Sequence, residues 1–169
     1  WIETVRKVLT QAAQAPFACS NSLHQSFETA CTWLLTCKGR VICCGVGKSG
    51  HIANKTAATL ASTGTPAFFM HAAEAVHGDL GMVMRGDLVL ALSASGETTE
   101  ILELLPTIKR LGVPLITFTG DCLRPPNGHS PSSLAQAADV ALDCSIHKEA
   151  CSLGLAPTAS TTTMLALGD

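Results

Sequence analysis

Tyrosine is absent from the 169-residue sequence, and aromatic residues make up only 4% of it. The chain therefore has few side chains that could stack on nucleic-acid bases. Its 11 lysines and arginines are scattered and its formal net charge is −2, so it has no basic stripe and we expect no nucleic-acid partner. No apolar run reaches the length of a membrane span, so we expect no membrane partner.

Closely spaced cysteine pairs are also missing, since none of the eight cysteines belongs to a C-x-x-C motif. Several lie inside apolar runs, as in Val41–Cys44, where a thiol behaves as a small core residue. We therefore interpret the cysteines as reduced, and we expect a cytoplasmic protein rather than a disulfide scaffold.

The pattern along the chain changes at Gly39. Residues 1–38 carry apolar positions at helical spacing and predict two leading helices that pack on the domain, with Pro16 punctuating them. Residues 39–169 alternate between short apolar runs and amphipathic stretches. The predicted strands are 41–44, 67–70, 88–92, 115–118 and 140–142, and the predicted helices are 49–63, 72–77, 98–111 and 132–138.

This alternation predicts an α/β fold in one domain. Parallel strands need crossover connections, so we expect a three-layer sandwich with a five-stranded parallel sheet in flavodoxin-like order. Residues 121–131 are rich in proline and glycine and predict an exposed loop. Since the sequence ends within a helix-like pattern at residues 167–169, we expect the domain to be truncated at its C-terminal end.

Two turns rich in glycine and hydroxyl residues, 45–50 and 93–98, each follow an apolar run and open a predicted helix. At the carboxyl edge of a parallel sheet, free backbone N–H groups and the helix dipole favour an anion. Small residues let the backbone approach a ligand, and hydroxyls supply uncharged donors. Together the turns predict one phosphate pocket at a topological switch point.

Two nucleotide-binding motifs fit the first turn less well. The turn satisfies G-x-G-x-x-G, but the second predicted strand ends at Met70 and is followed by His71, without the carboxylate that a dinucleotide fold uses for the ribose. Residues 47–49 also fit the end of a P-loop, but Ile42 stands where that loop needs its first glycine. NAD and ATP are therefore disfavoured.

Several separated motifs resemble, in the same order, the sugar isomerase (SIS) domain of bacterial D-arabinose 5-phosphate isomerases. They are residues 45–50, 61–69, 77–81, 95–97, 148–151 and 153–158. The resemblance implies interconversion of D-ribulose 5-phosphate and D-arabinose 5-phosphate, the entry to Kdo and lipopolysaccharide synthesis. It also implies a phosphorylated pentose as substrate, no required cofactor, and a homotetramer with active sites shared between subunits.

The resemblance further implies roles for single residues. The phosphate is held by Ser49, Ser93, Ser95 and Thr98, the substrate is contacted by Gly64 and Thr65, and the chemistry involves Lys48, His77, Glu100 and Glu149. His71 matches a histidine associated with zinc, in an inhibitory or structural role. A further histidine that takes part in catalysis in this family would fall beyond Asp169. The paired CBS modules that many members carry after the SIS domain do not occur in residues 1–169.

Aldose–ketose isomerisation moves a proton between adjacent carbons through an enediol(ate), so it needs a base and groups that stabilise negative charge. We expect a glutamate as the base, Glu149 first and Glu100 second. Lys48 would stabilise the enediolate oxygen or bind the phosphate. Histidine side chains ionise near neutral pH, so His77 suits ring opening or proton relay.

Each of these residues also has a structural interpretation. Glu97 and Glu100 lie where a carboxylate complements a helix dipole. Glu149 is also typical of a solvated ion pair with the lysine before it. His77 fits a loop residue, and His71 fits a buried histidine, since one histidine makes no metal site.

Three functions would share the phosphate pocket. The leading hypothesis is an isomerase of phosphorylated pentoses. Another SIS isomerase, acting on hexose or heptose phosphates, would differ in its carboxylates and histidines. A module that only senses sugar phosphates would need the hydroxyl turns but not paired carboxylates with a histidine, so the residues present favour turnover.

Overall fold

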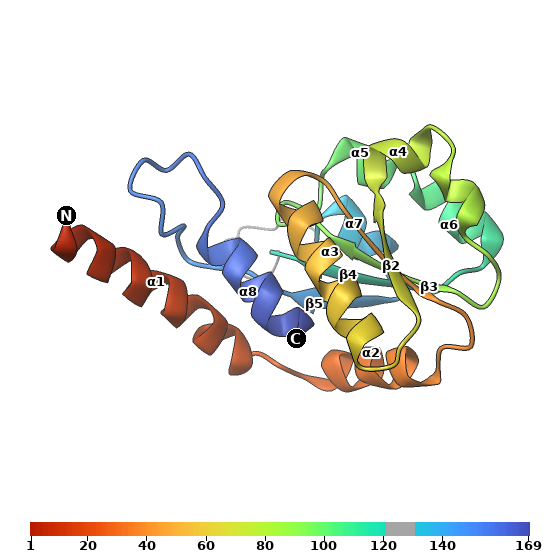
Figure 1. Ribbon diagram of the computed structural model, residues 1–169, viewed down its shortest axis with the longest axis horizontal. Helices are drawn as coiled ribbons and strands as arrows, with labels where there is room; N and C mark the ends of the chain where they lie inside the picture. The colour runs from red at the N-terminus through yellow and green to blue at the C-terminus, as the bar shows by residue number, and fades with distance from the viewer. Residues whose placement is uncertain (121–130) are drawn as a thin grey trace.

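The computed structural model describes residues 1–120 and 131–169, and its centre is a sheet of five parallel strands (Figure 1). In spatial order these are β2 (Ala67–His71), β1 (Val41–Gly45), β3 (Leu88–Leu92), β4 (Leu115–Thr119) and β5 (Val140–Asp143). This is the flavodoxin-like order, which confirms the predicted fold class. Each strand begins where the sequence predicts, and four of the five extend one residue further.

Helices cover both faces of the sheet. They are α1 (Ile2–Ser20), α2 (Gln25–Thr36), α3 (Gly47–Ser62), α4 (Ala72–Val76), α5 (Thr99–Leu102), α6 (Leu105–Leu111), α7 (Ser133–Ala137) and α8 (Ala159–Gly168), with the short 3-10 helix η1 (Asp79–Met82). Buried side chains of α2, α3 and α8 pack in the core on one face, and those of α4 to α7 pack in the core on the other. No helix within the described ranges is long and apolar enough to cross a membrane.

Successive residues of β1 alternate between these two cores. Val41 and Cys43 face the core that contains α3, whereas Ile42 and Cys44 face the core that contains α4 and α5. Burial raises the pKa of both thiols to about 12, so they stay protonated at neutral pH. These two cysteines are apolar core residues, as predicted.

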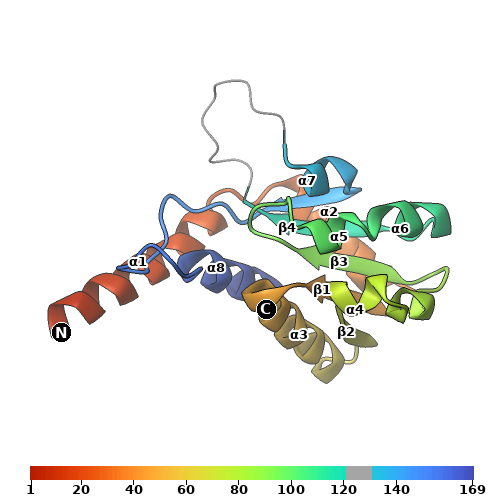
Figure 2. The ribbon, with the colours of Figure 1, turned by 90° about the horizontal axis from the view of Figure 1, so that it is seen from above.

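The two leading helices are present and join the domain differently. α2 packs on the sheet core through Phe27, Ala30 and Trp33, whereas α1 packs along α8 and extends away from the sheet (Figures 1 and 2). Pro16 does not separate the two helices, contrary to the sequence prediction. It lies inside α1, and the chain leaves the helix at residues 21–24 instead.

The prediction of one helix over residues 98–111 is wrong in its continuity, because the segment forms α5 and α6 with Glu103 and Leu104 between them. Pro106 has no N–H to donate to the Leu102 carbonyl, which a continuous helix would require. Proline is tolerated in the first turn of a helix, so a new helix begins at Leu105. The loop predicted over residues 121–131 lies outside the described residues except for its last position.

Carboxylates fasten the amino edge of the sheet. Asp87 is 3% exposed and accepts hydrogen bonds from the backbone N–H groups of Arg40, at 2.8 Å, and Met84, at 2.9 Å, and from Arg40 Nη2 at 2.9 Å. Burial alone would raise the pKa of Asp87, but these hydrogen bonds and the guanidinium charge outweigh it and lower the pKa. Asp139 accepts from the Leu115 N–H at 2.8 Å, at the start of β4.

Candidate active site

The first glycine turn joins β1 to α3 at the carboxyl edge. A Cβ on Gly45 would lie 3.0 Å from the Gly50 nitrogen, so the two backbones touch and the helix starts close against the strand. Gly47 has a φ of +56°, which favours glycine. Lys48 is exposed and Ser49 is half-buried in the first turn of this 16-residue helix. The free N–H groups and the dipole of α3 suit an anion here.

The second turn follows β3 and is organised by Ser93. Ser93 is 2% exposed, and its Oγ accepts from the Gly96 N–H at 3.1 Å and lies 2.7 Å from Thr98 Oγ1. Its hydroxyl is therefore bonded inside the turn, and the phosphate contact expected of Ser93 stays a prediction. Ser95 is exposed and presents its hydroxyl at the surface of the turn.

The second turn also packs on the amino end of α7. Gly96 has a φ of +64°, and a Cβ there would lie 1.9 Å from Ser132 Oγ. The Gly96 carbonyl accepts from the Leu134 N–H at 3.1 Å, and Glu97 Oε1 accepts from the Ser133 N–H at 2.8 Å. These contacts give Glu97 a structural role at the amino end of α7, rather than at the start of the helix that follows it in sequence, where the sequence analysis places it.

The two predicted histidines flank α4 at the carboxyl end of β2. His71 is the last residue of β2 and the N-cap of α4, and its Nδ1 accepts from the Ala73 N–H at 3.3 Å. Its ring stands edge-on to Phe69, with ring centroids 6.2 Å apart. His71 is thus a half-buried histidine with a backbone partner, whereas His77 follows α4 and is exposed.

The described residues give His71 no set of partner ligands for zinc. No group of three or more histidine, cysteine, aspartate or glutamate side chains that could hold a metal occurs among residues 1–120 and 131–169. Structural zinc sites use four protein ligands and catalytic sites use three. With Nδ1 bonded to the backbone, His71 would be a single ligand of a set that this part of the chain does not supply.

Glu149 lies between β5 and α8 and binds the amino end of α8. Its Oε2 accepts from the Thr158 N–H at 2.7 Å, the Thr158 hydroxyl at 3.0 Å and the Ser160 N–H at 3.3 Å, and its Oε1 accepts from the Ser160 hydroxyl. Burial alone would raise the pKa of Glu149, but these hydrogen bonds outweigh it and lower the pKa. The partners of Glu149 are therefore groups of α8 rather than a solvated lysine.

The direction of α8 brings Glu149 toward the first turn. α8 packs beside α3, and the two helices run the same way (Figures 1 and 2). Gly168 of α8 packs against the Thr56 side chain of α3. Counting nine residues back from each reaches Ala159 and Gly47, where the two helices begin. Both helices rise equally per residue, so their amino ends lie at the same level.

Gly64 and Thr65 lie at the opposite edge of the sheet. They follow α3 and precede β2, and they line a shallow hollow with Arg40 and Phe68. The 16 residues of α3 alone span about 24 Å. One copy of the chain therefore does not bring Gly64 and Thr65 to the two turns.

The carboxyl edge nevertheless gathers most of the predicted site residues from three neighbouring strands. They follow β2 (His77), β1 (Lys48 and Ser49) and β3 (Ser95, Thr98 and Glu100). The direction of strand connection reverses between β1 and β3, which makes this the topological switch point where open α/β sheets bind ligands. Glu100 is half-buried in the first turn of α5.

Comparison with known proteins assigns the family. Residues 34–169 match the model of the SIS domain. The chain belongs to the SIS domain family. The matched region includes both turns and all three strands that carry the site, and it begins inside α2, so that α1 lies outside it.

Curated relatives confirm the resemblance to arabinose 5-phosphate isomerases. Over 147 residues, the chain is 60% identical to arabinose 5-phosphate isomerase KdsD of Pseudomonas aeruginosa and 56% identical to that of Escherichia coli K12. These alignments cover 87% of this chain, but only 43% and 42% of the two relatives. The chain thus spans less than half the length of the curated relatives it matches.

Solved structures share the fold over nearly the whole chain. A protein of E. coli CFT073, solved in complex with arabinose 5-phosphate, has a TM-score of 0.89 at 45% identity, covering 99% of this chain and 85% of that one. A candidate phosphosugar isomerase from Bacteroides fragilis has a TM-score of 0.87 at 38% identity, with the same coverage of 99% and 85%. Vibrio vulnificus NanR with ManNAc-6P shares the fold alone. Its TM-score is 0.75 at 19% identity, and the match covers 95% of this chain and 57% of that one.

Proposed function

We propose that this chain is the isomerase domain of an enzyme that interconverts D-ribulose 5-phosphate and D-arabinose 5-phosphate. The observation that carries the proposal is the meeting of two anion-binding turns with His77 and Glu100 at one switch point. It is supported by 60% identity to a curated arabinose 5-phosphate isomerase and by the fold shared with a 45% identical protein in complex with arabinose 5-phosphate.

The substrate phosphate binds across the two turns. The free N–H groups and dipole of α3, with the Ser49 hydroxyl, supply one side, and the hydroxyls of Ser95 and Thr98 supply the other. The Thr98 hydroxyl hydrogen is available to the phosphate when Ser93 donates to Thr98 Oγ1. Lys48, exposed in the first turn of α3, adds a positive charge for the anionic substrate. Because the phosphate is remote from the reacting carbons, this binding holds the sugar in a reactive pose.

Glu149 is the base that moves the carbon-bound proton. An ionised carboxylate has about four sites for hydrogen-bond donors. Oε2 accepts three hydrogen bonds and Oε1 accepts one, which leaves Oε1 free to take a proton. The lowered pKa keeps Glu149 ionised at neutral pH, as a base requires. Glu100 is the second candidate, from its place beside the second turn.

In the direction of the aldose, Glu149 removes a proton from C1 of ribulose 5-phosphate and returns it to C2 of the enediolate. His77, exposed at the neighbouring strand end, moves the hydroxyl proton from O1 to O2. A proton held on a carboxylate exchanges with solvent before it returns. Turnover in D₂O therefore places deuterium at C2 of the product.

The full-length protein incubated in D₂O with ribulose 5-phosphate, and separately with a panel of ketose phosphates, tests the proposal. We expect arabinose 5-phosphate with deuterium at C2. Turnover of hexose or heptose phosphates alone would assign a different SIS isomerase. Saturable binding of sugar phosphates without deuterium uptake would assign a sensing module and overturn the proposal.

We further propose a homotetramer whose sites are shared between copies. Gly64 and Thr65 lie at the amino edge, so they would join a site only on another copy. α1 also presents apolar side chains that are between 53% and 73% exposed: Ile2, Val5, Leu9 and Phe17. Light scattering should give four chain masses at micromolar concentration, and a monomer would contradict this assembly.

A cytoplasmic location is part of the same proposal. The cysteines within the described residues are all free, as expected in a reducing compartment. Cell fractionation with an antibody to the protein checks the location, and recovery with the membrane or periplasmic fraction would contradict it.

A further inference from the structure

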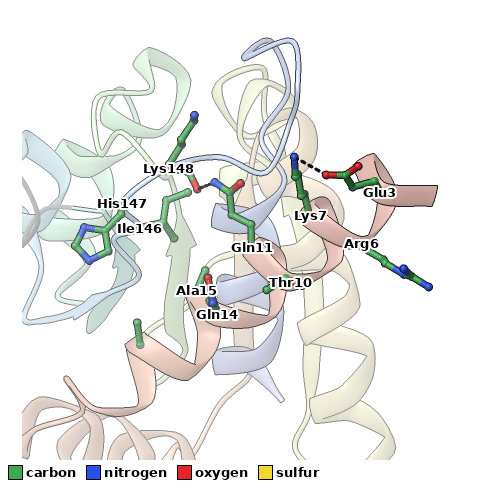
Figure 3. A pocket seen from close by; sticks show the side chains of 11 residues that line it. Glu3, Arg6, Lys7, Thr10, Gln11, Gln14, Ala15, Ile146, His147 and Lys148 are labelled. Carbon is green, nitrogen blue, oxygen red and sulfur yellow. Dashed lines mark hydrogen bonds and ion pairs between the residues drawn. The ribbon is translucent and has the colours of Figure 1, made fainter. Parts of the chain in front are cut away.

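Gln11 of α1 ties two distant parts of the chain together. Its Nε2 donates to the Lys148 carbonyl at 3.1 Å and to the Glu149 carbonyl at 3.0 Å, across 137 and 138 residues of sequence. Figure 3 shows the Gln11 side chain reaching from α1 toward residues 146–148. Gln11 and residues 146–148 line a groove of about 660 Å³. Both hydrogens of the amide thus hold main chain at Glu149.

The segment that Gln11 holds has little structure of its own. Residues 144–158 form neither helix nor strand, and they connect β5 to α8. Beyond Glu149, the Ala150 N–H donates to Thr158 Oγ1 at 2.9 Å, and Thr158 in turn donates to the Glu149 carboxylate. Glu149 is therefore fixed twice: its main chain is held by α1 and its carboxylate by the amino end of α8.

We propose that Gln11 is a positioning residue that sets the place of the Glu149 carboxylate for proton transfer. The inference rests on the proposed isomerase function. α1 and α8 pack on each other, so they form one frame around residue 149. Without the two hydrogen bonds of Gln11, the described hydrogen bonds that remain at residues 148–150 are those of the Glu149 carboxylate and the Ala150 N–H, all from the α8 side. A displacement of about 1 Å can cost about a hundredfold in rate.

The same helix provides a matched control. Gln14 lines the same groove, but it makes no hydrogen bond to the described residues. Methionine has nearly the length of glutamine and no N–H donor. Gln11→Met therefore removes the two hydrogen bonds, whereas Gln14→Met makes the same chemical change without removing one.

The experiment measures turnover of ribulose 5-phosphate and amide hydrogen exchange in the full-length protein and in both variants. For Gln11→Met we expect kcat to fall about tenfold, with KM within about twofold and a melting temperature lowered by only a few degrees, because two hydrogen bonds are lost. The amides of Ala150 and Thr158 should exchange faster. Gln14→Met should match the parent in every readout.

The exchange measurement separates this inference from the proposed function. If the parent does not isomerise the substrate, the proposed function fails, while faster exchange in Gln11→Met still shows that Gln11 holds residue 149. Unchanged exchange in Gln11→Met overturns the inference. So does an unchanged kcat in an active parent, or a fall in kcat that is accounted for by unfolded protein at the assay temperature, since that would show a general structural role.

Discussion

Replacing Gly96 by alanine tests how the second turn is built. The φ of Gly96 is +64°, and an added Cβ would lie 1.9 Å from Ser132 Oγ and 2.4 Å from Ser132 Cβ. Ser132 cannot move away freely, because it is 1% exposed and its Oγ accepts from the Ala135 N–H at 3.3 Å as the N-cap of α7. The substitution therefore strains the turn and disturbs the helix that packs on it.

The magnitude follows from these two effects. A left-handed backbone conformation costs an alanine about 1–2 kcal/mol. Displacing the N-cap hydroxyl of α7 costs about 1 kcal/mol more. We expect Gly96→Ala to lower the free energy of unfolding by about 2–3 kcal/mol, and also to weaken the binding of sugar phosphates, because the turn carries Ser95.

Urea unfolding measures the free energy, and calorimetry measures the affinity for ribulose 5-phosphate. Gly81→Ala is the control, since a Cβ on Gly81 meets nothing within 4 Å; a change within about 0.5 kcal/mol is expected there. Adding Ser132→Gly to Gly96→Ala removes the side chain that the new Cβ would meet. The double variant should therefore recover the part of the lost unfolding free energy that comes from this contact. A Gly96→Ala variant within about 0.5 kcal/mol of the parent would refute the reasoning.

Two further predictions concern the buried or half-buried carboxylates. Glu149→Gln should slow isomerisation and deuterium uptake at least about a hundredfold and lower stability at pH 7 by about 1–2 kcal/mol. The pKa of Glu149 in the folded protein is lowered from 4.5, so its contribution to stability is present above pH 4.5. This contribution is lost as the pH falls through the pKa of the folded protein. The acid unfolding curves of the parent and the variant should therefore converge. Full turnover would remove Glu149 from the mechanism. Asp87→Asn should lower the free energy of unfolding by about 1–3 kcal/mol, because the buried carboxylate that accepts from Arg40 and Met84 is lost, while the Arg40 side chain, 39% exposed, stays solvated. The kcat at 25 °C should not change. An unchanged melting temperature would contradict the importance of this ion pair.

The strands could be predicted from sequence because each is a short apolar run between turns. The three central strands, Val41–Gly45, Leu88–Leu92 and Leu115–Thr119, are buried on both faces, whereas the edge strands β2 and β5 are only partly buried. The prolines show where local rules are insufficient. Pro106 interrupts a helix, whereas Pro16 lies inside α1, an alanine-rich helix that packs along α8. We attribute the different effects of these two prolines to tertiary packing, which a local sequence pattern does not reveal.

The candidate site also has residues that the sequence could place and residues that it could not. Residues placed by the strand-to-helix turns, such as Lys48 and Glu100, lie at the edge where the motifs put them. The burial of Ser93 depends on its side chain bonding inward to Thr98, which spacing alone does not determine. The role of Gln11 has no local signal at all, because its partners lie 137 and 138 residues away.

The ion pair between Arg40 and Asp87 stands where strands begin, whereas the turns that would receive a substrate stand where strands end. This arrangement separates groups that stabilise the fold from several of the exposed candidate ligand-binding groups. Substitution of the exposed Ser95 or His77 side chain therefore leaves the Arg40–Asp87 ion pair at the opposite edge of the sheet in place.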